Sequence, residues 1–244
     1  MLCWERWNAF PFHLGEIGVM SQTIPHVSGI ILAGGQSRRM GRDKAFIELG
    51  GKPIIQRALD AVRAVCTETI IVANDTETYA RWGARVVSDV FPGKGALGGV
   101  FSGLQAAREV YALAVACDMP FLNVELLRYL VSLAPAFDVV IPRADDPSAQ
   151  SVRGDGRSTK RIGLHPLHAV YSKNCLAAME TRLKAGDLRL IGFPATVRVV
   201  EAEEIDRFDG GHWSFFNVNT AEDLIVAQSN SHVVASQGGR YDQR

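Results

Sequence analysis

The sequence has no excess of either charge and no apolar run long enough to cross a membrane. Its 26 Lys and Arg residues balance its 26 Asp and Glu residues, so no net field draws the chain to nucleic acid or to an anionic membrane. A membrane-spanning helix needs about 20 apolar residues in a row, and no segment reaches that length. We therefore expect neither a nucleic-acid partner nor a membrane partner.

Cysteine is scarce as well. The chain has four cysteines, scattered without the spacing of a metal site: Cys3, Cys66, Cys117 and Cys175. Two of them, Cys66 and Cys117, lie in apolar segments. Free thiols are typical of a reducing compartment, so we expect a cytoplasmic protein.

The 244 residues are 47% hydrophobic, which allows one sizeable core or at most two small domains. We expect a single domain over residues 27–228. Residues 1–26 are interpreted as an N-terminal extension, because they carry acids and lack the continuous apolar core of a signal peptide. Met20 is the expected native start, and residues 229–244 are expected to form a disordered tail.

Short apolar runs alternate with segments of helical spacing along most of the chain. We expect strands at Ile30–Ala33, Phe46–Leu49, Thr69–Ala73, Ala84–Ser88, Tyr111–Ala116, Asp138–Ile141, His168–Tyr171, Thr196–Val200 and Phe215–Val218. Helices are expected at Pro53–Val65, Glu77–Trp82, Val100–Glu109, Val124–Leu133, Ser172–Lys184 and Thr220–Gln228. The polar segment Arg143–His165 has no periodicity and is expected to be a mobile loop. This alternation predicts an α/β fold of three layers, a mostly parallel Rossmann-like sheet with helices on both faces and ligands at one rim.

The stretch Val27–Lys44, VSGIILAGGQSRRMGRDK, has the densest chemistry in the chain. Its apolar run ends at Gly34 and Gly35, whose backbone freedom lets main-chain N–H groups approach a ligand closely. The loop that follows carries three cations: Arg38, Arg39 and Lys44. Such cations suit several negative charges at once, as in a triphosphate, so we expect a nucleotide site. In this prediction Lys44 is an exposed loop cation that adds little to stability.

Polar residues follow other expected strands. Asp118 comes directly after Tyr111–Ala116, where a lone carboxylate suits Mg²⁺, which prefers one or two carboxylates plus substrate phosphate oxygens. A capping or turn aspartate is the alternative. Asn217 and Asn219 can coordinate a metal or bind an acceptor without adding charge, or simply end a strand before a helix cap.

The segment Gly93–Gly98 is a literal G-x-G-x-x-G. That pattern is also the fingerprint of dinucleotide-binding folds, where it directly follows the first strand of the sheet. Here Asp89-Val90-Phe91-Pro92 separates the glycines from the preceding strand, and the unit is the third in the chain. An NAD-type oxidoreductase therefore stays open as a weak alternative.

Several of these segments resemble one known family. Leu32-Ala33-Gly34-Gly35, Ser37, Arg39-Met40-Gly41 and Asp43-Lys44 resemble the signature of the molybdenum cofactor guanylyltransferases, nucleotidyltransferases with a Rossmann-like fold. Cys117-Asp118-Met119-Pro120 is similar to the metal-binding motif of that family, and Asn217-Val218-Asn219-Thr220 to its asparagine-rich segment. Gly95–Gly99 resembles its Gly-Pro-Leu-x-Gly segment, with Ala96 in place of proline. The resemblance runs from about Ile30 to Leu224, interrupted by the polar segment.

The resemblance implies roles for individual residues. Catalytic residues would be Arg39, Lys44 and Asp118, with Asp118 as the Mg²⁺ ligand. Nucleotide-binding residues would be Leu32, Ala33, Gly34, Gly35, Lys44, Asn74, Asp89, Gly95, Gly99 and Asp118. Acceptor-binding residues would be Arg189, Asn217 and Asn219.

The resemblance also implies a reaction: transfer of GMP from Mg-GTP to the terminal phosphate of molybdopterin, with release of pyrophosphate. GTP and molybdopterin would be the substrates, and molybdoenzyme maturation proteins are candidate partners. A cytidylyltransferase, a sugar-phosphate nucleotidyltransferase and a nucleotide-binding adaptor without catalysis remain alternatives.

Overall fold

The structure, a computed structural model, describes residues 25–33, 44–145, 147, 151–152, 158–159 and 162–230. Some of the predictions fall outside these residues. They concern the start at Met20, the tail beyond residue 230, and three site residues: Gly34, Gly35 and Arg39.

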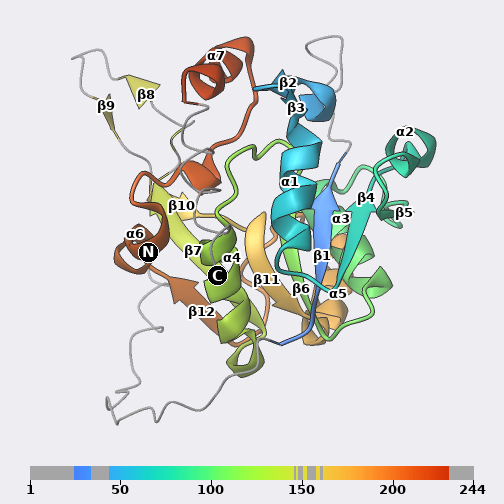
Figure 1. Cartoon of the computed structure of the whole chain (residues 1–244). Helices are drawn as coiled ribbons and strands as arrows, with labels where there is room; N and C mark the ends of the chain where they lie inside the picture. Colours follow the sequence, from blue (N-terminus) through green and yellow to red (C-terminus); the bar gives the residue numbers. More distant parts are fainter. Residues whose placement is uncertain are drawn as a thin grey trace.

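An eight-stranded sheet lies at the centre of the molecule, in the order β10-β7-β11-β6-β1-β4-β5, with β12 paired to β7 (Figure 1). The strands are β1 (Val27–Leu32), β4 (Glu68–Val72), β5 (Arg85–Val87), β6 (Tyr111–Ala116), β7 (Val139–Asp145), β10 (Ile162–Leu164), β11 (His168–Ser172) and β12 (Val197–Val200). Four of the pairings are parallel, and only β10 and β11 run against their neighbours. The mostly parallel α/β sheet predicted from the sequence is therefore confirmed.

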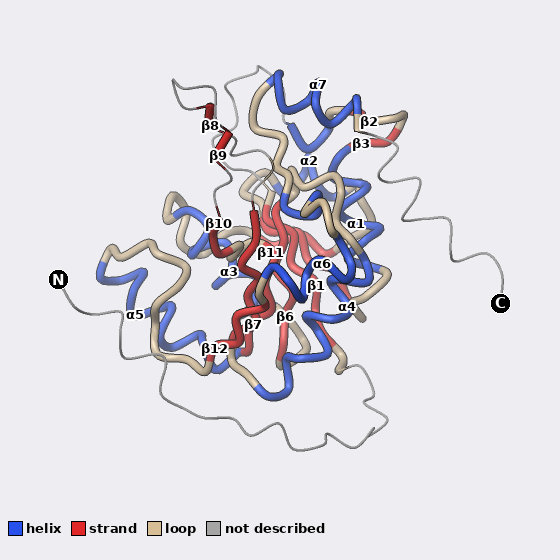
Figure 2. Tube along the Cα trace, turned by 90° about the vertical axis from the view of Figure 1, so that its left-hand side faces the viewer, coloured by secondary structure: helices blue, strands red, loops and turns tan. Residues whose placement is uncertain are grey.

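Helices cover both faces of the sheet (Figure 2). They are α1 (Ile54–Arg63), α2 (Thr76–Ala80), α3 (Gly95–Ala106), α4 (Val124–Leu133), α5 (Leu176–Ala185), α6 (Ala202–Asp209) and α7 (Ala221–Ser229). Because side chains alternate along a strand, Ile31 of β1 packs in one core with α1 and α4, whereas Ile30 packs in a second core with α3 and α5. Both isoleucines are fully buried.

A third, smaller core lies apart from these two. It joins the short hairpin β2 (Glu48–Leu49) and β3 (Lys52–Pro53) to α7 and to the segment before it. Its buried members are Leu49, Ile54, Phe121, Phe216, Val218 and Ala227. This cluster fixes the C-terminal segment beside the turn that follows β6.

Helix α3 begins at Gly95, five residues before the predicted start at Val100, so Gly95–Gly99 form its first turns rather than a loop. The glycines allow the helix to approach β1 closely. A Cβ atom on Gly99 would lie 2.8 Å from a methyl carbon of Leu32, and one on Gly103 would lie 2.5 Å from a methyl carbon of Ile30. Tertiary packing against β1 therefore outweighs the low helix propensity of glycine.

Other predicted elements also differ from the structure. No strand forms at Phe215–Val218; a 3-10 helix, Trp213–Phe215, is followed by extended chain that bonds to a loop. Helix α6 was not predicted, since it buries only Ile205 and Asp209 and its apolar face is narrow. Strand β7 continues to Asp145 and pairs with β10, so parts of the predicted mobile loop belong to the sheet.

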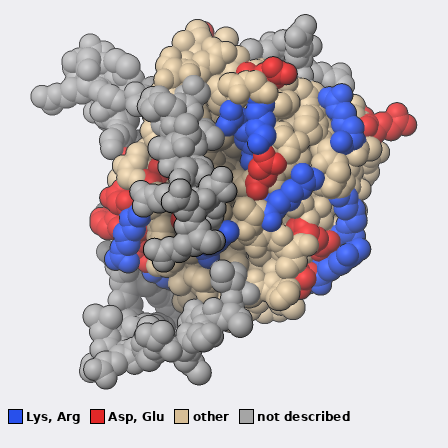
Figure 3. All heavy atoms as spheres, viewed as in Figure 1, with Lys and Arg blue, Asp and Glu red and all other residues tan. Residues whose placement is uncertain are grey.

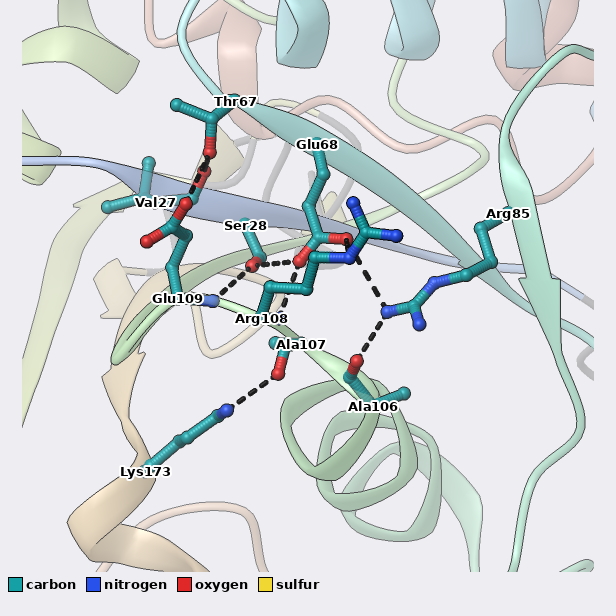
Figure 4. A network of polar contacts seen from close by, with 10 residues as sticks. All are labelled: Val27, Ser28, Thr67, Glu68, Arg85, Ala106, Ala107, Arg108, Glu109 and Lys173. Carbon is teal, nitrogen blue, oxygen red and sulfur yellow. Dashed lines mark hydrogen bonds and ion pairs between the residues drawn. The ribbon is translucent and has the colours of Figure 1, made fainter.

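At the edge where the parallel strands begin, Glu68 joins three elements of the fold (Figure 4). Its Oε1 accepts hydrogen bonds from Ser28 Oγ and from the Arg108 backbone N–H, both at 2.6 Å. Its Oε2 lies 3.4 Å from Arg85 Nη2, which also donates to the Ala106 carbonyl. Burial pushes the pKa of Glu68 upward, but these hydrogen bonds and the two arginine charges outweigh burial and hold that pKa below its ordinary value of 4.5.

We expect Glu68→Gln to lower the free energy of unfolding at neutral pH by about 1–3 kcal/mol, as loss of hydrogen bonds to a charged group does. A lowered folded-state pKa means that ionised Glu68 stabilises the fold above its ordinary pKa, and that this stabilisation is lost as pH falls through the folded-state value. The difference between the two proteins in urea unfolding should therefore shrink below pH 4.5.

Glu180→Gln is the control, since Glu180 forms an exposed pair with Lys184 and its loss should have little effect at any pH. A Glu68→Gln deficit that stays constant on acidification would contradict the role given to this carboxylate.

Candidate active site

The parallel register brings the ends of the central strands to one edge of the sheet. Leu32, the last residue of β1, stands opposite Val72 of β4 and Ala116 of β6. The ladder continues one residue further, because Ala33 N–H donates to the Val72 carbonyl at 2.9 Å and Cys117 N–H to the Leu32 carbonyl at 3.0 Å. The residues that follow these strands therefore lie along the same rim.

This ladder limits how Ala33 can contact a nucleotide. The backbone N–H of Ala33 is engaged in the sheet, so it is not a free donor for a ligand. A contact of Ala33 with a ligand would have to use its carbonyl or methyl group. Backbone N–H groups that donate to a nucleotide would have to come from residues after Ala33. Gly34 and Gly35 lie outside the described residues.

Asp118 carries a buried carboxylate oxygen, Oδ1, that has no hydrogen-bond partner among the described residues. Burial raises the pKa of Asp118, and a hydrogen bond from its own backbone and the positive charge of Lys44 oppose that rise. An unpaired carboxylate oxygen in a partly desolvated position is a good acceptor for a cation. Lys44 and Asp118 lie on the same side of the molecule, because Val218 N–H donates to the Asp118 carbonyl and the next residue, Asn219, accepts from Lys44 Nζ.

Lys44 begins a short 3-10 helix, Lys44–Phe46, and is only 8% exposed. Its Nζ donates a hydrogen bond to the backbone carbonyl of Asn219. The prediction that Lys44 is an exposed loop cation was therefore wrong, because the C-terminal segment covers it. A buried ammonium needs such a partner, since an unpaired charge would be costly to desolvate.

The C-terminal segment closes the same edge. Val218 N–H donates to the Asp118 carbonyl at 3.0 Å, so the two neighbouring asparagines lie beside Asp118. The Asn217 side chain donates to the Phe215 carbonyl at 2.9 Å, and Asn219 is exposed. The structure therefore brings Lys44, Asp118 and the asparagine segment together, although they are far apart in the chain.

Asn74 and Asp89 meet at the ends of β4 and β5. The Asp89 N–H donates to Asn74 Oδ1 at 3.3 Å, and Asp89 Oδ1 accepts from Phe91 N–H and from the Ser102 hydroxyl, both at 2.9 Å. Ser102 of α3 thus orients this carboxylate. Ser102 was not among the predicted site residues, because an isolated serine in an apolar helix gives no signal of such a role.

Three further predicted site residues, Gly95, Gly99 and Arg189, have contacts that serve the fold. Gly95 begins α3 with a φ of +64°, and Gly99 faces Leu32 inside the fold. Arg189 lies after α5, where its guanidinium pairs with Asp187 at 2.7 Å. None of these three residues takes part in the bond from Lys44 to Asn219 or in the bond from Val218 to Asp118. Their binding roles stay predictions.

His168 of β11 is fully buried against the Phe215 ring, with a ring-centroid distance of 4.7 Å, and neither ring nitrogen has a hydrogen-bond partner among the described residues. Burial, aided by the charge of His165, lowers the pKa of His168 to about 3, so it stays neutral. Its ring packs against Phe215, two residues before Asn217.

No group of three or more His, Cys, Asp or Glu side chains within the described ranges is arranged to hold a metal ion. Asp118 nevertheless fits Mg²⁺, because the orphaned oxygen is a hard anionic ligand and this ion takes its other ligands from phosphate oxygens and water. None of the helices that the structure describes is long and apolar enough to span a membrane.

The fold and the chemistry of this rim are those of the nucleotidyltransferases. Residues 29–197 match the family of the MobA-like NTP transferase domain. A probable molybdenum cofactor guanylyltransferase of Pelotomaculum thermopropionicum is 39% identical over 203 residues, which cover 82% of this chain and 91% of that protein. The molybdenum cofactor guanylyltransferase of Desulfosudis oleivorans is 36% identical over 207 residues, 83% of this chain and 95% of that protein. The chain belongs to this family of nucleotidyltransferases.

Solved structures agree with the fold. Molybdopterin-guanine dinucleotide biosynthesis protein A from Archaeoglobus fulgidus superposes with a TM-score of 0.68 at 24% identity, over 84% of this chain and 99% of that one. A 2-C-methyl-D-erythritol 4-phosphate cytidylyltransferase from Thermus thermophilus gives a TM-score of 0.61 at 20% identity, over 85% and 99% of the two chains. At these identities the likeness shows the fold alone.

We expect Asp118→Asn to raise the free energy of unfolding at neutral pH when divalent metal is absent. A raised folded-state pKa means that ionised Asp118 opposes folding, and that this penalty disappears as pH falls through the folded-state value toward 3.8. The gain should therefore be present in urea unfolding at neutral pH with a chelator and should vanish in acid.

Asp89→Asn is the matched control, because the Asp89 carboxylate already accepts hydrogen bonds and its replacement should bring no gain. An equal gain in both variants, or a loss of stability in Asp118→Asn, would contradict the assignment of Asp118 as a destabilising carboxylate that is available to a ligand.

Proposed function

We propose that the protein transfers GMP from Mg-GTP to the terminal phosphate of molybdopterin, releasing pyrophosphate and forming the guanine dinucleotide form of the cofactor. The observation that carries this proposal is the meeting of Lys44, Asp118 and the asparagine segment at one rim of the sheet. The names of the relatives support the choice of GTP and molybdopterin.

Mg²⁺ would be held by Asp118 through Oδ1, which has no partner among the residues that the structure describes, and it would supply positive charge to the α-phosphate when bound. Lys44 supplies a second positive charge from a nearly dry position, where electrostatic stabilisation is stronger than in water. We assign Lys44, together with Arg39, to the charge that builds on the leaving pyrophosphate.

The attacking group is an oxygen of the acceptor phosphate, which forms a bond to the α-phosphorus as the bond to the pyrophosphate oxygen breaks. This oxygen is already ionised, so the reaction needs no general base. The chain has mainly to position the two substrates and to stabilise charge. We assign Asn217 and Asn219 to binding of the acceptor. They flank Val218, whose N–H donates to the Asp118 carbonyl, and their amide side chains add no negative charge.

The NAD-type alternative loses its structural basis. The Gly93–Gly98 segment comes after β5, which lies at one end of the sheet order, and from Gly95 onward it belongs to α3, whereas a dinucleotide fingerprint follows the first strand of its unit. Two glycines of the segment serve the turn, with φ of +78° at Gly93 and +64° at Gly95.

The surroundings of the reaction are also proposed. Cys66, Cys117 and Cys175 form no disulfide among the described residues, which supports a cytoplasmic location. On the face shown in Figure 3, basic and acidic side chains lie interspersed, which supports small-molecule substrates rather than nucleic acid as partners. Molybdoenzyme maturation proteins are proposed to receive the product.

Pyrophosphate release with each of the four nucleoside triphosphates, with and without molybdopterin, tests the proposed reaction. We expect release with GTP and Mg²⁺ only when molybdopterin is present. Preference for CTP would indicate a cytidylyltransferase, and turnover with a sugar phosphate in place of the pterin a sugar-nucleotide enzyme. GTP binding without any release would indicate an adaptor.

We expect Lys44→Ala to lower turnover on the order of 10²–10³-fold, as loss of a preorganised charge partner does. It should also lower the free energy of unfolding by about 1–3 kcal/mol, because the Asn219 carbonyl loses a charged donor. Lys52→Ala is the control, since Lys52 is 46% exposed and pairs only with a surface aspartate. Full turnover in Lys44→Ala would refute its role.

A further inference from the structure

The peptide group between Asn219 and Thr220 is held at both ends by charged side chains. Its carbonyl accepts from Lys44 Nζ, and its N–H donates to Asp223 Oδ2 at 2.8 Å. The peptide is trans, so the C=O and N–H bonds point in opposite directions across one rigid plane. Lys44 and Asp223 therefore lie at opposite ends of a single stiff connector.

Asp223 also holds the preceding peptide. The same oxygen, Oδ2, accepts from Asn219 N–H at 2.8 Å. An ordinary capping box has two hydrogen bonds. Here Thr220 N–H donates to the Asp223 carboxylate, and Asp223 N–H donates to the Thr220 hydroxyl at 3.1 Å. The bond to Asn219 is additional to helix capping, and it fixes the rotation of the connector.

The bond between Asp223 and the Thr220 N–H strengthens the bond between the Asn219 carbonyl and the Lys44 ammonium. A carboxylate at the N–H end of a peptide draws the amide proton and makes the carbonyl oxygen more negative, and such linked hydrogen bonds strengthen one another by roughly 10–30% each. Lys44 is nearly buried, so the direction of this carbonyl decides where its ammonium sits relative to Asp118. A displacement of about 1 Å in a catalytic group is enough to slow a reaction severely.

We infer that Asp223 of α7 is a positioning residue, which sets the place of the Lys44 ammonium through the Asn219–Thr220 peptide. This inference rests on the proposed function of Lys44. Asp223 acts through Lys44 and the Asn219 backbone and is given no contact with the nucleotide, so its loss lowers the rate of transfer more than the binding of GTP.

Kinetics of three variants test the inference. Asp223→Ala should lower kcat by roughly 10–100-fold while the KM for GTP changes less than about threefold. Asp223→Asn keeps a side-chain oxygen that can accept both N–H groups, so its kcat should lie between those of the wild type and Asp223→Ala.

Thr220→Ala is the matched control. It removes the hydroxyl that accepts from Asp223 N–H and weakens the cap of α7, but it leaves both bonds from the backbone to Asp223 Oδ2. Its kcat should stay within about twofold of wild type, whereas its helix stability falls by about 1 kcal/mol. An equal loss of kcat in Thr220→Ala and Asp223→Ala would overturn the inference, as would an unchanged kcat in Asp223→Ala.

A readout without catalysis separates this inference from the proposed function. Because Lys44 and Asp223 act on one peptide group, the drop in urea midpoint of the Lys44→Ala, Asp223→Ala double variant should be smaller than the sum of the single drops. Additive drops would overturn the inference even if the wild type is active. Absence of pyrophosphate release from the wild type would refute the proposed function and leave this coupling to be judged by the unfolding data.

Discussion

The site depends on the parallel pairing of β1 with β4 on one side and β6 on the other. Because all three strands run in one direction and end in register at Leu32, Val72 and Ala116, the residues that follow them share one rim. A slip of one residue in either pairing would turn the alternating side chains of β1 toward the wrong core. The register thus secures both the packing of the sheet and the placement of Ala33, Ala73 and Asp118 along one edge.

Two ionisable side chains are held at this rim in positions that ordinary folding would avoid. Asp118 has a carboxylate oxygen with no hydrogen-bond partner within the described part of the chain, and Lys44 is buried and bonded to the C-terminal segment. Their charges favour one another, but each has lost much of its contact with water. The attraction within such a pair is largely offset by the loss of water around each charge, and desolvated charges of this kind are common at functional sites.

Much of the architecture could be predicted from the sequence because it depends on local pattern. The apolar runs of β1 and β6 and the helical spacing of α1 and α4 each indicate the element that forms. The start of α3 could not be predicted, because glycine is unfavourable in a helix and only the approach to Ile30 and Leu32 shows why it is needed there. Phe215–Val218 has the composition of a strand, yet its backbone partner is the Asp118 loop rather than a sheet edge.

The residues of the site were easier to predict than their surroundings. Lys44 and Asp118 stand in recognisable motifs, but the burial of Lys44 depends on a carbonyl near the other end of the chain. The spacing of Thr220 and Asp223 indicates a capping box, whereas the bond to Asn219 cannot be foreseen from spacing. Motifs therefore identify the chemical groups, and tertiary contacts decide how those groups are held.

The bond between Lys44 and the Asn219 carbonyl has a consequence for protein synthesis. The ribosome releases the glycine-rich loop early and the asparagine segment late, so a nascent chain carries its ammonium for most of translation without the acceptor it has in the finished fold. The bond from Lys44 can form only when residues 217–219 have left the exit tunnel, and a chain that stalls before them contains every strand of the central sheet but lacks the segment that bonds to Lys44 and to the Asp118 carbonyl.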